Sequence, residues 1–298
     1  WPDKMYEKVE KCPLCNNKDY ENFIICRDYT VSQESFAITQ CQSCKFLFTN
    51  PRPKKKAIQH YYESEDYISH SNKANSLINT LYKVIRSYTL SNKVKIINNL
   101  TEHNTILDYG CGTGTFLELA KSNNWKIAGI EPSDRAKSIA INKLGNNIYS
   151  TIDKLDETEQ FDIITLWHVL EHVHDLNKTI KQLKSHLKKK GTLIIALPNN
   201  SSFDQQLYKQ HWAAFDVPRH LYHFNQLTIK TLAHKHYFKI MKIIPMKFDS
   251  FYVSLLSEKY KTGKSNYWKS LINGWRSNRW AKNNNNDYSS LIYILKNK

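Results

Sequence analysis

Short apolar runs and longer stretches with helical periodicity alternate through residues 105–244 of the chain. Short runs of this kind predict buried strands, and apolar residues three and four positions apart predict amphipathic helices. Their alternation favours an α/β domain with a mostly parallel sheet. The predicted strands cover 105–109, 126–131, 147–151, 161–167, 192–197, 238–244 and 290–296, and the predicted helices cover 116–122, 133–144, 176–189 and 226–236.

The rest of the chain follows other patterns. Residues 23–26 and 35–39 are strand-like, whereas residues 74–100 carry apolar side chains at helical spacing and predict a long helix on the core. Two polar, aromatic segments near 199–225 and 250–287 are expected as insertions that cover the substrate side. These patterns divide the chain into 1–53, a helical linker or lid over 54–100, and a main domain over 101–298.

The turn after the first strand of the main domain reads Asp108-Tyr-Gly-Cys-Gly-Thr-Gly114. Its glycines let a ligand approach the backbone, and the helix N-terminus behind it offers free N–H groups. The order differs from the dinucleotide pattern G-x-G-x-x-G, and no Lys-Ser or Lys-Thr follows, which excludes a P-loop. Asp108 suits an ammonium group, and Glu131 at the end of the second strand can accept ribose hydroxyls. A ligand with a ribose, a cationic amino-acid end and no phosphate is S-adenosylmethionine.

These residues and the later run Phe161-Asp-Ile-Ile-Thr-Leu-Trp-His-Val-Leu-Glu-His172 resemble the class I S-adenosylmethionine-dependent methyltransferases. The resemblance implies a Rossmann-like, seven-stranded sheet whose last two strands form an antiparallel hairpin, with the insertion at 250–287 between them. It also implies the residues that contact the cofactor, which are Asp108, Gly110, Cys111, Gly112, Gly114, Glu131, Pro132, Asp153, Trp167 and His168.

Two C-x-x-C pairs, Cys12 with Cys15 and Cys41 with Cys44, have the spacing of a tetrahedral zinc site built from two tight turns. With the strand-like runs between them they predict a zinc ribbon over 1–53, whose four cysteines leave no open position for catalysis. Disulfides and a redox C-x-x-C are disfavoured, because neither a secretion signal nor a βαβ context is visible. A ribbon can bind nucleic acid, bind a partner or stabilise a lobe.

The segments 48–53 and 61–70 follow the ribbon and resemble methyltransferases with a zinc-binding N-terminal lobe, including the sugar C-methyltransferase type. Their tyrosines Tyr61, Tyr62 and Tyr67 either cover the active site or pack as a cluster at the lobe junction. In the first case Tyr62 is expected to contact the substrate.

Glu171 and His172 follow the fourth strand of the main domain, at the edge where open α/β sheets bind ligands. The motif resembles the Leu-Glu-His of quinone-ring O-methyltransferases, which carry an acid where this chain has His168. This difference argues against carrying metal-assisted O-methylation over to the chain. His172 is a candidate base, and the alternative is that it ends a helix with Glu171 orienting it.

The insertion at 199–225 is unusually dense in functional side chains and is interpreted as the substrate cover. Asp216 and His220 are candidate proton acceptors. Arg219 is expected to hold an anionic group, with Trp212 as a further substrate contact. The alternative is an ordered insertion held by pairing of Asp216 with Arg219. Both interpretations are retained in part, with Asp216 and Arg219 structural and His220 functional.

Composition narrows the function further. The chain has 298 residues and a net charge of +16, with the positive charge spread along it. No apolar run is long enough to cross a bilayer, and no secretory signal is visible, so a cytoplasmic protein with no membrane partner is expected. We expect a small, anionic acceptor such as a nucleotide-linked sugar or a quinone or lipid precursor. The alternatives are an RNA methyltransferase that grips phosphates with the ribbon, and a non-catalytic cofactor-binding protein. The oligomeric state is left open.

Overall fold

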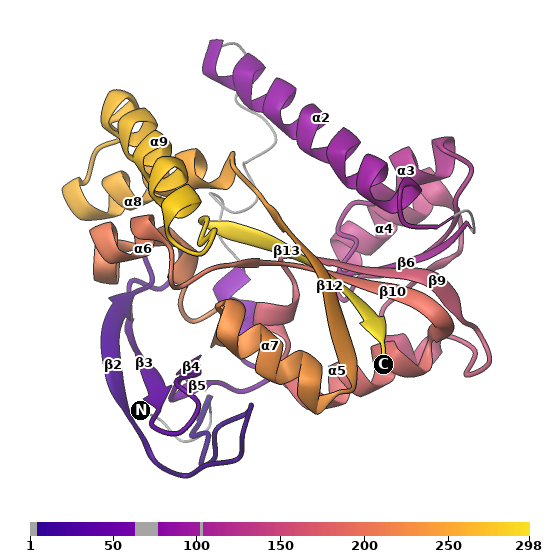
Figure 1. Cartoon of the computed structure of the whole chain (residues 1–298), viewed down its shortest axis with the longest axis horizontal. Coiled ribbons are helices and arrows are strands. Elements are labelled where there is room, and N and C mark those ends of the chain that lie inside the picture. Colours follow the sequence, from indigo (N-terminus) through magenta and orange to yellow (C-terminus); the bar gives the residue numbers. More distant parts are fainter. Residues whose placement is uncertain (1–4, 63–76, 102–103) are drawn as a thin grey trace.

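The computed structural model describes residues 5–62, 77–101 and 104–298, apart from the side chains of 77–84 and 86; Tyr67 lies outside this part. The main domain is a seven-stranded sheet with helices on both faces (Figure 1), as the sequence predicts. In spatial order its strands are β12 (Phe238–Pro245), β13 (Ser290–Asn297), β10 (Leu187–Pro198), β9 (Phe161–Trp167), β6 (Thr105–Tyr109), β7 (Lys126–Ile130) and β8 (Ile148–Tyr149).

The strand directions follow the expected arrangement. The neighbours from β8 to β10 are parallel, and β13 runs antiparallel to both β10 and β12. The insertion between β12 and β13 contains the helices α8 (Asp249–Thr262) and α9 (Tyr267–Asn283). Since parallel strands end at one edge of a sheet, the turns after β6, β7 and β9 meet there, and this edge is where ligands bind in such folds.

Adjacent residues within the central strands face opposite cores. Ile106, Ile163 and Ile194 belong to one apolar cluster, and the next residue of each strand belongs to the other. The first cluster is covered by α2 (Leu77–Asn98), α3 (Thr115–Ser122) and α4 (Asp134–Leu144), and the second by α5 (Leu176–Ser185) and α7 (Gln226–Lys235), as Figure 1 shows. Burial on both faces explains why these strands are apolar throughout rather than alternating.

One predicted boundary is wrong. The helix expected over 176–189 ends at Ser185, and Leu187 already pairs with Phe161 of β9. The backbone N–H of Phe161 donates to the carbonyl of His186 at 2.8 Å, which starts the strand early. Lys188 then forms an ion pair with Asp162 at 2.9 Å. The lysine run continues a helical pattern in sequence, but pairing with β9 decides its structure. The strand expected over 147–151 is present but shorter.

The N-terminal lobe holds a four-stranded antiparallel sheet in the order β11, β4, β3, β2. Three of its strands come from the predicted ribbon. The fourth, β11, comes from the insertion at 199–225 and pairs with β4, so the lobe's sheet is completed from the main domain. A separate two-stranded ribbon joins β1 to β5. The bounds are β1 (Tyr6–Glu7), β2 (Tyr20–Arg27), β3 (Ser35–Cys41), β4 (Leu47–Thr49), β5 (Arg52–Pro53) and β11 (Tyr222–His223).

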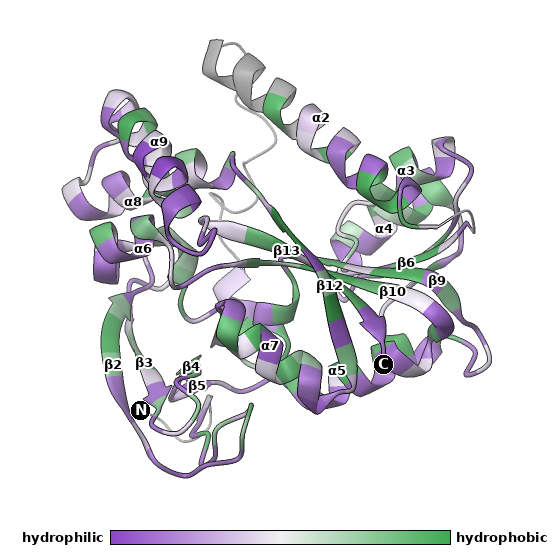
Figure 2. Cartoon of the chain, viewed as in Figure 1, coloured by the Kyte–Doolittle hydropathy of each residue, from purple (hydrophilic) through white to green (hydrophobic). Residues whose placement is uncertain are grey.

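Both expected insertions are ordered structures. The one at 199–225 forms α6 (Phe203–Tyr208), two single 3-10 turns and β11. The other forms the α8–α9 hairpin, which stands at the upper left of Figure 1, apart from the helices on the central sheet. Figure 2 shows green, apolar segments among the purple ones of α9.

Candidate functional site

The glycine turn joins β6 to α3 through three residues with positive φ, Gly110, Gly112 and Gly114. A Cβ on Gly110 would lie 2.5 Å from a methyl group of Val169, and one on Gly114 would lie 2.7 Å from Leu144. A Cβ on Gly112 would meet no heavy atom within 4 Å. Two of the glycines therefore allow the turn to pack, and the third leaves open space beside the backbone where a ligand fits.

Glu131 closes the glycine turn onto the end of β7. Its Oε2 accepts the N–H of Gly112 at 2.8 Å, and its Oε1 accepts the N–H of Ser133 at 2.8 Å. A carboxylate has about four acceptor positions, so the two oxygens keep the capacity to accept hydroxyl groups. The expected ribose acceptor thus lies beside the open side of Gly112, and it also holds the turn in shape.

Asp108 lies buried at the end of β6 and accepts a hydrogen bond from the Thr165 hydroxyl at 2.7 Å. Burial raises the pKa of Asp108 to about 6, although the hydrogen bond from Thr165 and the charge of Lys93 oppose the shift. A buried carboxylate with a raised pKa lacks a full complement of partners. A cationic ligand group next to it would supply one.

The other expected cofactor contacts lie around the same edge. Cys111 is buried, Pro132 and Asp153 are exposed, and Asp153 accepts a hydrogen bond from Gln182 at 2.6 Å. Trp167 packs against Phe116 and has a buried indole N–H with no hydrogen-bond partner among the described residues. An indole N–H buried without a partner is costly, so a ligand acceptor at this position would stabilise the site.

Glu171, His172 and His220 form a second group beyond β9. One ligating atom of each lies within 4.8 Å of the others, and neither carboxylate oxygen of Glu171 has a hydrogen-bond partner in the described structure. The Nδ1 of His172 lies 3.1 Å from the carbonyl of Arg219, and the Nδ1 of His220 lies 2.9 Å from that of Ala214. Since a carbonyl only accepts, both Nδ1 atoms carry hydrogen, and Nε2 keeps a lone pair wherever the ring is neutral. The group can accept a proton or hold a metal ion.

His168 lies between two carboxylates beside this group and offsets their negative charge. Its ring lies 3.5 Å from Glu171 and 3.4 Å from Asp249 at the start of α8. Burial alone would lower its pKa, but the two carboxylates outweigh burial and raise the pKa of His168 to about 9. For His172, burial together with the charge of His220 outweighs the opposing charges of Glu171 and Asp216 and lowers its pKa to about 4. His168 is therefore an imidazolium at neutral pH, whereas His172 is neutral.

Tyr62 reaches the same group from the N-terminal side. Its hydroxyl lies 2.9 Å from Nδ1 of His172, so the tyrosine expected against the substrate contacts a candidate catalytic side chain. The neighbouring Tyr61 is buried and bonds to Tyr6 and Glu34, as in the packed cluster that was the alternative.

Arg219 and Trp212 need correction as substrate contacts. The Arg219 side chain is 1% exposed, and its donors reach Asp216, Asp28 and the carbonyl of Tyr61. Those carboxylates outweigh burial and raise its pKa further. Trp212 is buried and donates to Asp204 at 2.7 Å. Both side chains hold the insertion in place, as the structural alternative for Asp216 and Arg219 predicts, and neither is free to meet an anionic group.

Two partners of the site were missed from sequence. Asp28 pairs with Arg219 at 2.9 Å from the loop between β2 and β3, and Asp249 pairs with His168 from α8. Asp28 lies 191 residues from Arg219 in sequence, so only the fold brings the two together. Asp249 directly precedes the insertion predicted over 250–287, which was expected on the substrate side.

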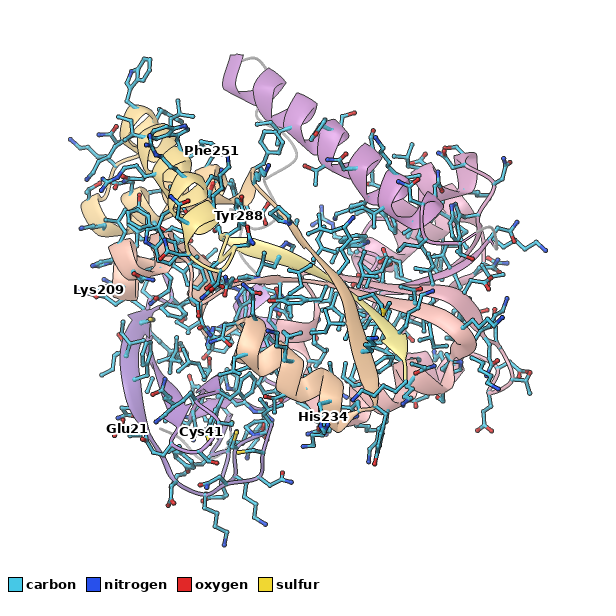
Figure 3. The ribbon with its side chains drawn as sticks, viewed as in Figure 1. Glu21, Cys41, Lys209, His234, Phe251 and Tyr288 are labelled. Carbon is cyan, nitrogen blue, oxygen red and sulfur yellow. The ribbon has the colours of Figure 1, made fainter. Side chains whose placement is uncertain are left out.

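The four N-terminal cysteines come together without disulfides (Figure 3, near Cys41). Their sulfur atoms lie within 4.8 Å of one another, with Cys12 to Cys44 at 3.6 Å and Cys15 to Cys41 at 3.5 Å. A tetrahedral zinc with Zn–S bonds of about 2.3 Å separates its sulfurs by about 3.8 Å. Each C-x-x-C is followed by a residue with positive φ, Asn16 or Lys45, so the two turns have matching shapes. The donor set and spacing fit zinc.

The fold and the open glycine turn define the class: an α/β protein with a ligand site at the carboxyl ends of its parallel strands. A family model described as a methyltransferase domain matches residues 82–243, and the chain belongs to this family.

Curated relatives match over shorter stretches. The chain is 27% identical over 131 residues to the ubiquinone biosynthesis O-methyltransferase of Bradyrhizobium diazoefficiens, covering 41% of this chain and 51% of that protein. It is 33% identical over 102 residues to a dTDP-4-amino-2,3,4,6-tetradeoxy-D-glucose N,N-dimethyltransferase of Saccharopolyspora spinosa, covering 32% and 41%. The chain thus spans about half the length, or less, of the curated relatives it matches.

A solved structure shares the fold. It is a magnesium protoporphyrin IX methyltransferase of Synechocystis PCC 6803 with bound SAH, which is 14% identical and has a TM-score of 0.53. The match covers 82% of this chain and 100% of that one.

Proposed function

We propose that the protein is an S-adenosylmethionine-dependent methyltransferase that acts on a small molecule. The observation that carries the proposal is the glycine turn, where Gly112 leaves open space, Asp108 lies at the end of β6 and Glu131 directly follows β7. Membership of the methyltransferase-domain family supports it. When bound, the cofactor supplies an electrophilic methyl group on sulfur.

The chain's residues would divide the cofactor between them. Glu131 would accept the ribose hydroxyls, and Asp108 would hold the ammonium group, while the backbone at Gly110, Cys111, Gly112 and Gly114 leaves room for the amino-acid moiety. The same edge is bordered by the indole N–H of Trp167 and by the side chains of Asp153, Pro132 and His168. Holding both reactants in line would account for much of the rate enhancement.

The acceptor would lie against Glu171, His172 and His220, with Tyr62 and the insertion at 199–225 above it. The names of the relatives suggest a quinone or a nucleotide-linked amino sugar as the acceptor class. Either His172 or His220 could remove a proton from a hydroxyl through Nε2, which in His220 lies 4.0 Å from Asp216, and Glu171 would stabilise the resulting imidazolium. Arg219 is fully engaged within the protein, so it would not be the residue that contacts an anionic group of such an acceptor.

The first test combines binding and turnover. Purified protein with methyl-labelled S-adenosylmethionine and fractionated lysate should transfer label to a small-molecule fraction. Glu131→Gln replaces one acceptor oxygen by a donor that faces a backbone N–H, so cofactor affinity should fall roughly ten- to a hundred-fold. The matched control Glu118→Gln, an exposed acid on α3, should bind normally. Label in RNA would favour the RNA methyltransferase, and cofactor binding without any labelled product would favour a non-catalytic protein.

We further propose that Cys12, Cys15, Cys41 and Cys44 bind one structural zinc. Metal analysis should find one equivalent that Cys41→Ser removes. The buried Cys26→Ser is the matched control, because Cys26 lies outside the cluster and its loss should leave the zinc in place. Retention of full zinc content by Cys41→Ser would contradict this site.

A further inference from the structure

Helix α9 buries small and polar residues and exposes large apolar ones, which is the opposite of an ordinary surface helix. The face that packs on α8 and α6 consists of small or polar residues, which are Ser270, Asn273, Gly274, Ser277 and Ala281. At Gly274 a Cβ would lie 2.5 Å from the Phe251 ring of α8, so the two helices are in close contact there (Figure 3). Five large apolar side chains are exposed, and they are Tyr267, Trp268, Leu271, Ile272 and Trp275, whereas Trp280 is partly buried against Phe203 of α6.

These five side chains, called here the α9 apolar face, are strongly exposed. Trp268 is 79% exposed and Trp275 is 55% exposed. Their positions follow the i, i+1, i+4, i+5, i+8 spacing, so they lie along one stripe of the helix. Scattered apolar residues on a surface are ordinary, but a contiguous stripe with two tryptophans marks an interaction site.

The charge of the hairpin identifies the partner. Helix α9 contains Lys269, Arg276, Arg279 and Lys282 and no acidic residue, and all four are exposed. Over 249–283 seven basic residues face two acidic ones. Helices that lie in the surface of an anionic bilayer typically carry tryptophans on one side, have basic residues around them and show low net hydrophobicity.

A second copy of the chain is a poorer occupant. A symmetric dimer through the α9 apolar face would place two strongly basic hairpins against each other, and like charges there oppose association. Among the described residues no helix is long and apolar enough to cross a bilayer, so contact with a membrane through this face would be peripheral.

We propose that the α9 apolar face docks the protein on membranes rich in anionic lipid, with Trp268 and Trp275 in the interface and the basic residues against the headgroups. This revises the expectation, drawn from sequence, of no membrane partner. The inference does not rest on methyl transfer, because docking is measured without cofactor or acceptor.

The test uses the full chain and vesicles of phosphatidylcholine with or without phosphatidylglycerol. Cosedimentation should require phosphatidylglycerol and should weaken as salt rises, because exposed charges are screened. Trp268→Ser combined with Trp275→Ser should lower the partition coefficient roughly ten-fold or more. Arg279→Gln and Lys282→Gln should each lower it roughly five-fold.

The matched control is Leu227→Ser, which removes an equally exposed apolar side chain from α7, on a different part of the surface. It should bind vesicles as the parent does. Circular dichroism of each variant establishes that it is folded. Binding that persists in the double tryptophan variant, or no binding to anionic vesicles at all, would overturn the proposal. So would a dimer in solution that the same double variant abolishes, because the face would then bind a second copy.

Discussion

The two halves of the candidate site are assembled in different ways. The cofactor half is local in sequence, and its defining hydrogen bond joins Gly112 to Glu131 over a separation of 19 residues. The acceptor half is collected from the whole chain, because Tyr62 meets His172 over 110 residues and Asp28 meets Arg219 over 191. A local site is specified by a short motif, whereas a dispersed site depends on the packing of both lobes.

The largest effect on stability is expected from the ion pairs of Arg219, which hold the acceptor half together. Arg219→Met would leave Asp28 and Asp216 without their shared cation, and breaking a buried ion pair in this way costs about 3–5 kcal/mol of unfolding free energy. Urea unfolding would measure the loss. Arg279→Met on exposed α9 is the control and should change stability by less than about 0.5 kcal/mol. Equal stabilities of the two variants would show that the ion pairs do not hold the lobes together.

Glu171→Gln tests both catalysis and stability in the same half. The substitution removes one of the two carboxylates beside the His168 imidazolium, so the unfolding free energy should fall. If Glu171 supports proton transfer, turnover should fall roughly a hundred-fold with unchanged cofactor affinity. The experiment compares single-turnover rates with isothermal titration of the cofactor. Full activity would remove Glu171 from the catalytic group, and loss of a bound metal beyond the cysteine site would make it a ligand instead.

The cofactor half can be dissected with two glycines. Gly110→Ala adds both left-handed strain and an overlap with Val169, which together cost about 2–4 kcal/mol. Gly112→Ala adds strain alone, about 1 kcal/mol, because its Cβ enters open space. Thermal unfolding should rank them in this order. Among the folded variants, Gly112→Ala should lower cofactor affinity more than Gly110→Ala, because only the Cβ at position 112 enters the space for the ligand. A stable Gly110→Ala protein would mean that the turn can relax.

The smallest effect is a pH dependence of cofactor binding. The carboxylate of Asp108 receives an ammonium group only when it is ionised, and its pKa is raised to about 6. Affinity should therefore be constant above pH 6 and fall roughly ten-fold per unit below it. The stability of the free protein changes in the opposite direction. The pKa of Asp108 is 3.8 in the unfolded chain, so between this pH and pH 6 the folded protein holds a proton that the unfolded chain releases. The stability that this proton contributes is lost as pH rises towards 6.

Asp108→Asn is the matched variant for this measurement. It should bind the cofactor more weakly at pH 8, and its affinity should no longer vary with pH in this range. A parent protein with pH-independent binding down to pH 5 would show that another group meets the ammonium.

Sequence reasoning predicted the strands of the central sheet and the glycine turn because each depends on local pattern, and the resemblance to class I methyltransferases supplied the closing hairpin. It placed Leu187 and Lys188 in a helix, since a lysine-rich run keeps helical periodicity until a neighbouring strand pairs with it. The roles of Arg219 and Trp212 were assigned to the substrate because their residue types suit recognition. Whether such a side chain faces a ligand or a buried partner depends on distant residues such as Asp28 and Asp204, which no local pattern brings near.

The shared sheet of the N-terminal lobe has a consequence for synthesis of the chain. The exposed edge of β4 receives its partner only when β11 appears, and Thr49 meets His223 over a separation of 174 residues. On the ribosome the lobe therefore waits with an open strand edge while most of the main domain is made. An unpaired edge is a template for pairing with other chains. Early binding of a metal by the four cysteines would hold this lobe in shape during that interval, before the strand that completes it exists.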